Sequence, residues 1–180
     1  MAPDQDSAFG CPTCGQGFLE FKDSEYIAPH FGRILLSLTL CPQCGFKQRQ
    51  VTLLEEHEPS IYSVGVSSVD DLSIRIIRSD TASIKIPELN VEINPGLVAD
   101  ATISNVEAIL LDIRDRAEFL RDASDTQEER HNAENFLEQL ELALEGKKPF
   151  TLQIADPRGN SKIITDDPTK VTVRPLPLGT

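Results

Sequence analysis

Apolar and polar residues alternate along several short segments of this 180-residue chain. Alternation places the apolar side chains on one face of an extended strand, so each segment is expected to be a β-strand with one buried face. Clusters of Asp, Asn, Ser, Pro and Gly separate the segments and predict turns. The expected strands are residues 61–67, 72–76, 82–86, 91–93, 150–154, 162–165 and 171–173. Several short strands at this spacing predict an antiparallel barrel or sandwich.

A helical period replaces the alternation between about residues 103 and 145. Two apolar stripes step by three or four residues there: Ile103, Val106, Leu110, Ile113, Ala117 and Leu120, then Ala133, Phe136 or Leu137, Leu140 and Leu144. Residues 104–107 and 126–129 have the form of capping boxes, and Gly146 is placed to end the second helix. Because strands are expected on both sides, the pattern predicts a helical hairpin inserted into one β domain.

The four cysteines of the chain occur in two copies of one phrase, Cys11-Pro12-Thr13-Cys14-Gly15 and Cys41-Pro42-Gln43-Cys44-Gly45. Each C-x-x-C pair places two thiolates on one side of a tight turn, and the following glycine permits a positive φ. Four sulfurs form a closed tetrahedral shell that suits structural zinc and leaves no position for a substrate.

Two other uses of the cysteines compete with zinc. A disulfide framework is disfavoured because residues 1–10 are polar and acidic and show no signal peptide. Iron in a rubredoxin-like site is the closer rival, because such sites use a similar pair of knuckles. The aromatic residues expected around that iron are few here, with no Trp and only Tyr26 and Tyr62, so one structural zinc is favoured.

Apolar segments at 18–21 and 34–40 predict strands between the knuckles, and the metal replaces the core that so short a module lacks. Residues 24–33 are expected to form an exposed loop whose apolar, aromatic and basic groups suit a contact surface. His30 in this loop is expected to pack at the surface and not to bind the metal. The expected organisation is a flexible leader at 1–10, a zinc ribbon at 11–58, the β domain at 59–174 and an extended tail at 175–180.

The net charge of −12 is concentrated in the helical segment, where residues 100–145 carry 13 acidic and 4 basic side chains. A strongly acidic chain is repelled by phosphate backbones, so a ribbon that binds nucleic acid through general electrostatics is disfavoured. The charges are expected to form a solvated helix face. No run of about 18 apolar residues is present, so no membrane span is expected, and metal-bound cysteines fit a reducing, cytoplasmic compartment.

No catalytic constellation is evident in the sequence. The chain has neither a Walker loop nor a G-x-S-x-G motif, and its three histidines, His30, His57 and His131, are scattered over different elements. Asp156 and Asn160 lie in a segment of ordinary turn composition, so a structural role is expected for them. Arg75 and Arg78 are expected at the surface, with contact to an anion or an acidic partner as the sharper hypothesis.

Several segments together resemble the ZPR-type zinc-finger family, which includes single-module archaeal members. The segments are the two knuckles, residues 27–32 (IAPHFG), 69–80 (VDDLSIRIIRSD), 84–89 (IKIPEL), 104–107 (SNVE) and 156–161 (DPRGNS). They occur in the family's order as one module. Ile74, Arg78 and Ala108 depart from the Arg, Lys and Gly usual in the family.

The resemblance implies a zinc ribbon followed by a double-stranded β-helix domain that carries an inserted helical hairpin. It also implies a non-enzymatic role, in which the protein binds translation elongation factor 1-alpha, a GTPase, and assists its folding and biogenesis. The surface expected to contact this client comprises Ile27, His30, Phe31, Arg33, Arg75 and Arg78. The alternative from another class is a zinc ribbon that binds nucleic acid in transcription or translation.

Overall fold

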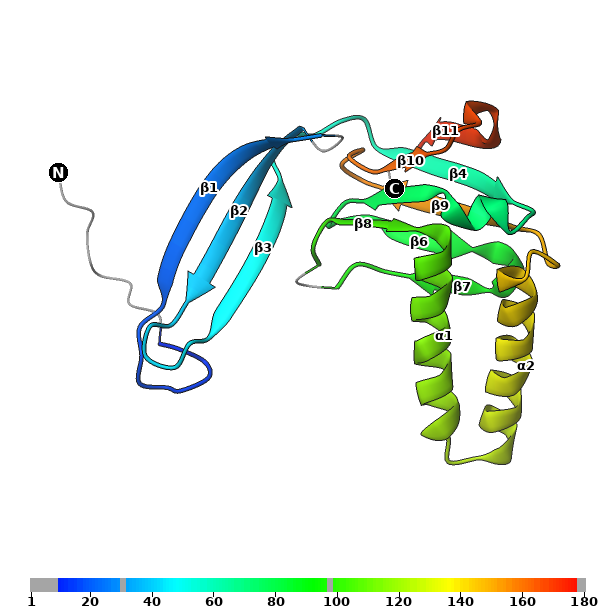
Figure 1. Ribbon diagram of the computed structural model, residues 1–180, viewed down its shortest axis with the longest axis horizontal. Coiled ribbons are helices and arrows are strands. Elements are labelled where there is room, and N and C mark those ends of the chain that lie inside the picture. The colour runs from blue at the N-terminus through cyan, green and yellow to red at the C-terminus, as the bar shows by residue number, and fades with distance from the viewer. Residues whose placement is uncertain (1–9, 30–31, 97–98, 178–180) are drawn as a thin grey trace. The chain divides into compact units, whose positions relative to one another are not determined.

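The structure is a computed structural model that describes residues 10–29, 32–96 and 99–177 (Figure 1). Its contacts divide the chain into two compact units, residues 1–55 and 56–180. Residues 56–58, which the sequence placed with the ribbon, group with the second unit. The predicted leader lies outside the described residues except for Gly10, which forms a β-bridge with Phe18.

The first unit contains one antiparallel sheet of three strands in the order β1-β2-β3. The strands are β1 (Glu20–Ala28), β2 (Gly32–Leu40) and β3 (Lys47–Leu53). The prediction of an exposed loop at residues 24–33 is wrong, because most of these residues are paired in the β1–β2 hairpin. The polar residues 22–25 interrupt the apolar pattern, but every one of them has a partner in β2, and the backbone pairing overrides the local composition.

The second unit contains two antiparallel sheets, as the alternating segments predicted. One has the order β10-β5-β8 and the other β11-β4-β9-β6-β7. The strands are β4 (Ser60–Val66), β5 (Arg75–Arg78), β6 (Ser83–Ile86), β7 (Val91–Ile93), β8 (Thr102–Asn105), β9 (Phe150–Asp156), β10 (Lys162–Ile164) and β11 (Val171–Pro175). Strand β9 alternates strictly between buried and half-buried positions, which is the signature of one face packed on a core.

A single apolar core joins both sheets to the helices. Ile76 of β5, Ile86 of β6, Leu152 of β9 and Leu110 of the first helix all belong to it, and none exposes a measurable fraction of its surface. All eighteen buried members of this core lie between Val64 and Ile154. The second unit is therefore able to fold around its own apolar core, with the hairpin contributing to it.

The helical hairpin lies between β8 and β9 in the chain, which confirms the predicted insertion. Its helices are α1 (Val106–Asp122) and α2 (Gln127–Leu144), which run antiparallel and extend away from the sheets (Figure 1). Thr126 and Glu129 form the predicted capping box. Among the described residues, no helix has both the length and the apolarity needed to cross a bilayer.

The predicted start of the first helix is wrong by three residues. Ile103 belongs to β8 and is 59 % exposed, and the side chain of Asn105 caps α1 by accepting from the Ala108 N–H. The capping box predicted at residues 104–107 therefore does not form. Leu120, predicted in the buried stripe, is 63 % exposed because the far end of the hairpin extends beyond the sheets (Figure 1).

Two further predictions are corrected near the sheets. Residues 72–76 alternate but begin as the 3-10 helix Asp70–Ser73, and strand β5 starts at Arg75. The predicted tail starts too early, since Pro175 ends β11 and the Leu176 N–H donates to the Pro59 carbonyl. Residues 178–180 of that tail lie outside the described residues.

Asp71 anchors the 3-10 helix to the segment before β11. Its carboxylate accepts from Ser67 N at 2.9 Å and Ser68 N at 3.2 Å, and pairs with the Lys170 ammonium. The hydrogen bond from Lys170 is the largest cause that lowers the pKa of Asp71 to about 2, against 3.8 for a free aspartate, and outweighs burial. Because the folded state holds the lower pKa, the stabilisation is complete above about pH 4 and is lost as the pH falls towards 2.

We expect Asp71→Asn to lower the free energy of unfolding by about 1–2 kcal/mol at pH 7, a range that allows for the partial exposure of Lys170. The deficit should shrink between pH 4 and pH 2, as the wild-type carboxylate becomes protonated. Thermal unfolding followed by helical circular dichroism measures it. The neighbouring exposed Asp70→Asn is the matched control, and a deficit independent of pH would assign the loss to shape instead of charge.

Candidate metal centre

Two matching turns build the metal centre from the cysteine motifs. In the first, Gly15 N donates to the Cys11 carbonyl at 2.9 Å, and in the second, Gly45 N donates to the Cys41 carbonyl at 3.0 Å. Gly15 and Gly45 have φ of +66° and +78°, a left-handed conformation that glycine adopts without strain. The predicted positive φ after each cysteine pair is confirmed, and it closes each turn so that both thiols face the same side.

The four cysteine Sγ atoms lie within 4.8 Å of one another. The Cys11 and Cys44 sulfurs are 3.6 Å apart, and those of Cys14 and Cys41 are 3.9 Å apart. A tetrahedral zinc with Zn–S bonds of about 2.3 Å requires sulfurs about 3.8 Å apart. The thiols are unpaired as disulfides, and Cys11 and Cys41 are almost wholly buried. The donor set and its spacing therefore fit one structural zinc held by all four residues.

The local electrostatics explain why a cation belongs between the sulfurs. Backbone N–H groups, chiefly that of Cys14, lower the pKa of the Cys11 thiol to about 6, and those of Gln16 and Gly17 lower the pKa of Cys14. The Phe46 N–H also favours a thiolate at Cys44, but desolvation and the other three sulfurs outweigh it and raise that pKa to about 12. Four thiolates repel one another, so a divalent cation is needed for all of them to ionise.

Gly17 is a part of the centre that the sequence patterns did not single out. Its carbonyl accepts from Cys11 N at 2.8 Å, and a Cβ atom built on it would lie 2.5 Å from the Cys41 sulfur. A side chain at this position would displace a ligand. The sequence holds only a local trace of this contact, since the first knuckle has a second glycine, Gly17, where the second knuckle has Lys47.

The jelly-roll domain of ZPR1 proteins matches this chain over residues 70–175, which cover most of the two-sheet unit. The chain belongs to the ZPR1 family. The double-stranded β-helix expected from the resemblance is thereby confirmed, since a jelly roll is that architecture. ZPR1 relatives are zinc finger proteins, and the cysteine cluster of this chain is the corresponding structural zinc site.

Archaeal ZPR1-like proteins match most of the chain. One from Pyrococcus horikoshii is 36 % identical over 158 residues, which are 86 % of this chain and 71 % of the relative. One from Methanocaldococcus jannaschii is 37 % identical over 155 residues, 86 % of this chain and 78 % of the relative. The zinc finger chaperone zpr1 of Schizosaccharomyces pombe is 33 % identical over 160 residues, which are 84 % of this chain but only 34 % of that protein. This ZPR1 module thus spans about a third of the yeast relative.

Two of the residues predicted for partner contact in the ZPR1 ribbon, Ile27 and Arg33, lie at the end of the β1–β2 hairpin. Ile27 and Arg33 are direct cross-strand partners, and Ile27 is 84 % exposed. The Arg33 guanidinium forms an ion pair with Glu25 at 2.9 Å, and the backbone N–H of Arg33 donates to the Glu55 carboxylate at 3.1 Å. His30 and Phe31, predicted beside them, lie outside the described residues.

Arg75 and Arg78 lie on β5 of the ZPR1 jelly roll, and the structure does not bring them to one site. Arg75 is exposed beside Asp70 and Asp167, in a cleft that also contains Lys170. Arg78 is half-buried, and it lines a different pocket with Ser104 and Arg116. The two arginines are therefore separate features, although the sequence had grouped them.

The DPRGNS segment of this ZPR1 chain has a structural role, as its turn composition predicted. Asp156 is fully buried and accepts from Ser161 N and Ser161 Oγ, both at 2.6 Å, from Arg158 N at 2.9 Å and from Thr81 Oγ1 at 3.2 Å. These bonds outweigh the cost of desolvation and lower the pKa of Asp156. Gly159 has φ of +65°, and its missing Cβ leaves room for the Glu58 carbonyl.

Proposed function

We propose that this chain is a non-enzymatic, zinc-dependent binding protein that contacts translation elongation factor 1-alpha and assists its folding. Membership of the ZPR1 family supports a role in protein interaction, as does the name of the yeast relative, a zinc finger chaperone. The partner itself is inferred from the family resemblance of the sequence. Any nucleotide hydrolysis would belong to the client, which is a GTPase.

The observation that carries this proposal is the exposed apolar surface of the ribbon sheet. Tyr26 lies opposite Ile34, and the alternate residue of β2, Leu36, lies on the same face. Tyr26 is 55 % exposed and Leu36 37 % exposed, while on the opposite face Ile27 and Phe21 are 84 % and 56 % exposed. Large apolar groups at this exposure are typical of protein contact surfaces.

The zinc supplies the rigidity that such a surface needs. Cys11, Cys41 and Leu53 are the only buried apolar side chains among the described residues of the first unit, and two of the three are ligands. Because so small a core can bury only a few apolar side chains, the other apolar side chains of the sheet remain exposed to solvent. We infer that these groups contact apolar segments of an incompletely folded client and are released once the client buries those segments itself.

The non-enzymatic part of the proposal rests on how the candidate catalytic residues are placed among the described residues. His57 lies in the segment between β3 and β4, His131 lies exposed on α2, and Asp156 is fully engaged with backbone and hydroxyl donors. The alternative, nucleic-acid binding, is disfavoured because the net charge of −12 opposes association with phosphates. Both considerations favour a protein partner.

Calorimetry with the zinc-loaded chain and purified elongation factor 1-alpha from the same organism tests the proposal. We expect the double variant Tyr26→Ser/Ile27→Ser to bind at least about tenfold more weakly, because both groups are large and exposed. Val173→Ser is the matched control, since Val173 is 59 % exposed on β11 of the second unit.

Unchanged affinity of the double variant would show that the ribbon is not the contact surface. The chain should also raise the yield of active factor on refolding from denaturant, and a chain without this effect is not a folding factor. Salt-dependent binding of RNA or DNA, without binding of the factor, would instead favour the nucleic-acid alternative.

A further inference from the structure

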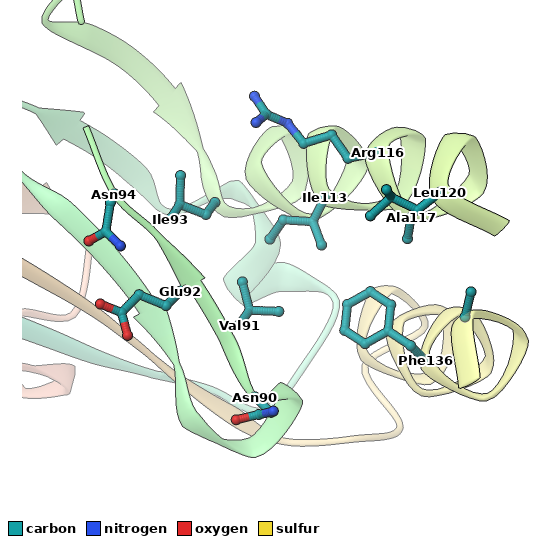
Figure 2. Close-up of a pocket in the computed structure, with 11 residues that line it drawn as sticks. Asn90, Val91, Glu92, Ile93, Asn94, Ile113, Arg116, Ala117, Leu120 and Phe136 are labelled. Carbon is teal, nitrogen blue, oxygen red and sulfur yellow. The ribbon is translucent and has the colours of Figure 1, made fainter. Parts of the chain in front are cut away.

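An apolar groove lies between β7 and the helical hairpin of the second unit. Its walls are formed by Val91 and Ile93 of β7, Ile113, Ala117 and Leu120 of α1, and Phe136 of α2, and its volume is about 500 Å³. Figure 2 shows Val91, Ile113 and Phe136 turned towards a common space, while Glu92 points away from the helices. The groove is thus lined by side chains from three elements, and its apolar walls and volume suit aliphatic side chains of a ligand.

One wall of this groove is an edge strand. Strand β7 is the last strand of the five-stranded sheet, and among the described residues it pairs only with β6. An edge strand presents backbone N–H and C=O groups that an extended peptide can extend as a further strand. The backbone of β7 and the apolar groove beside it therefore suit the same type of ligand.

A second pocket of about 320 Å³, lined by both apolar and polar residues, adjoins the groove, since Ile93 and Arg116 line both. Arg78, Thr102 and Ser104 lie in it, as does Asp112, which pairs with Arg116 at 3.0 Å. The Arg78 Nε atom is buried and has no hydrogen-bond partner, and no described residue forms an ion pair with the Arg78 guanidinium. The Arg78 guanidinium therefore has no carboxylate partner of its own and is available to pair with one that enters the pocket.

We propose that β7 and the hairpin bind an extended peptide segment of a partner protein, with aliphatic side chains in the groove and a carboxylate at Arg78. Two guanidinium groups against the one carboxylate of Asp112 leave this pocket positive, although the chain as a whole carries −12. The local charge therefore selects an acidic group, and the hydroxyls of Thr102 and Ser104 supply further donors. The adjoining apolar groove distinguishes a peptide from a free anion.

The probe for this site is a blocked heptapeptide with glutamate at both ends, valine at the third and fifth positions and threonine between them. In an extended strand the two glutamates and the two valines face one side, in either direction of binding, and the threonine faces the other. We expect it to bind the zinc-loaded full chain with a Kd below about 1 mM. Its counterpart with glutamine at both ends should bind at least about tenfold more weakly.

Matched substitutions locate the binding. Arg78→Gln should weaken the glutamate peptide at least about tenfold, and Arg114→Gln, the same change on α1 outside the groove, should leave it unchanged. Leu120→Ser should weaken both peptides, whereas Phe119→Ser, at an exposed neighbour that does not line the groove, should not. Amide chemical shifts should move at Val91, Glu92 and Ile93, and thermal unfolding checks that each variant is folded.

Three outcomes would overturn this proposal: no peptide binding up to about 1 mM, equal binding of the glutamate and glutamine peptides, or equal losses in Arg78→Gln and Arg114→Gln. Binding of inorganic phosphate that depends on Arg78, without peptide binding, would assign the pocket to a free oxyanion and also overturn it. The peptide site lies wholly in the second unit, and the probe is a peptide. Failure of the peptide to bind would therefore leave the proposed function of the ribbon untouched, and failure of the ribbon to bind its partner would leave the peptide site untouched.

Discussion

Cys41→Ser is expected to release the zinc and unfold the ribbon while the jelly roll remains folded. Cys41 is only 1 % exposed, and the first unit has almost no other buried apolar group to hold it together. The binding energy of a structural zinc, about 10–16 kcal/mol in small modules, is in such cases the folding energy of the module. The second unit has its own core of eighteen buried residues, so its thermal midpoint should not change.

Metal analysis, limited proteolysis and calorimetry measure this result together. The zinc content should fall from one per chain to near zero, and cleavage should begin within β1–β3. Gln43→Ser, in the same knuckle but exposed, is the control and should retain the metal. If Cys41→Ser keeps both its zinc and its resistance to protease, three sulfurs suffice and the closed four-thiolate shell is wrong.

Asp156→Ala should lower the free energy of unfolding of the second unit by about 3 kcal/mol or more. The change removes the acceptor of four hydrogen bonds. The buried N–H and hydroxyl of Ser161 thereby lose the carboxylate to which they donate. Since Ser161 Oγ also accepts from Ser79 N at 3.0 Å, the loss should extend to the turn after β5. Denaturant unfolding followed by helical circular dichroism gives the free energy.

Two variants separate charge from shape at this position. Asp156→Asn keeps the volume but places an amide donor among donors, so it should be almost as destabilising as the alanine variant. Asp166→Ala, at an exposed aspartate beyond the same turn, should change stability by less than about 0.5 kcal/mol. If Asp156→Asn were as stable as wild type, the negative charge would not matter and a neutral acceptor would suffice for the network.

Much of the fold was predictable because local patterns and tertiary packing agree. The strict alternation of β9 reflects a sheet with one buried face, and Thr126 with Glu129 forms a cap that depends on neighbours in sequence only. The prediction failed where the two disagree. Residues 22–25 lack a strand pattern but are paired with β2, and Ile103 continues a helical stripe but is held in β8 by its pairing with Ile77.

The zinc centre shows the same division on a smaller scale. The spacing of Cys11, Cys14, Cys41 and Cys44 was sufficient to predict a four-thiolate site, because each knuckle is a local turn that its own residues define. Gly17 was missed because its role is a contact with the Cys41 sulfur across the centre. Contacts of this kind join residues far apart in sequence and leave no periodic signal.

By itself, the sequence determined the ligands of the metal, the insertion of a helical hairpin into a β domain, and the acidic charge that disfavours nucleic acid. These follow from spacing, period and composition, which are local or additive properties of the chain. Only the tertiary structure decided that Arg75 and Arg78 line different pockets, and that Arg78 lies in the same pocket as Arg116 beside the edge strand β7. The physical reason is that a pocket is formed by side chains from separate elements, and the packing of those elements fixes which charges meet and which remain without a partner.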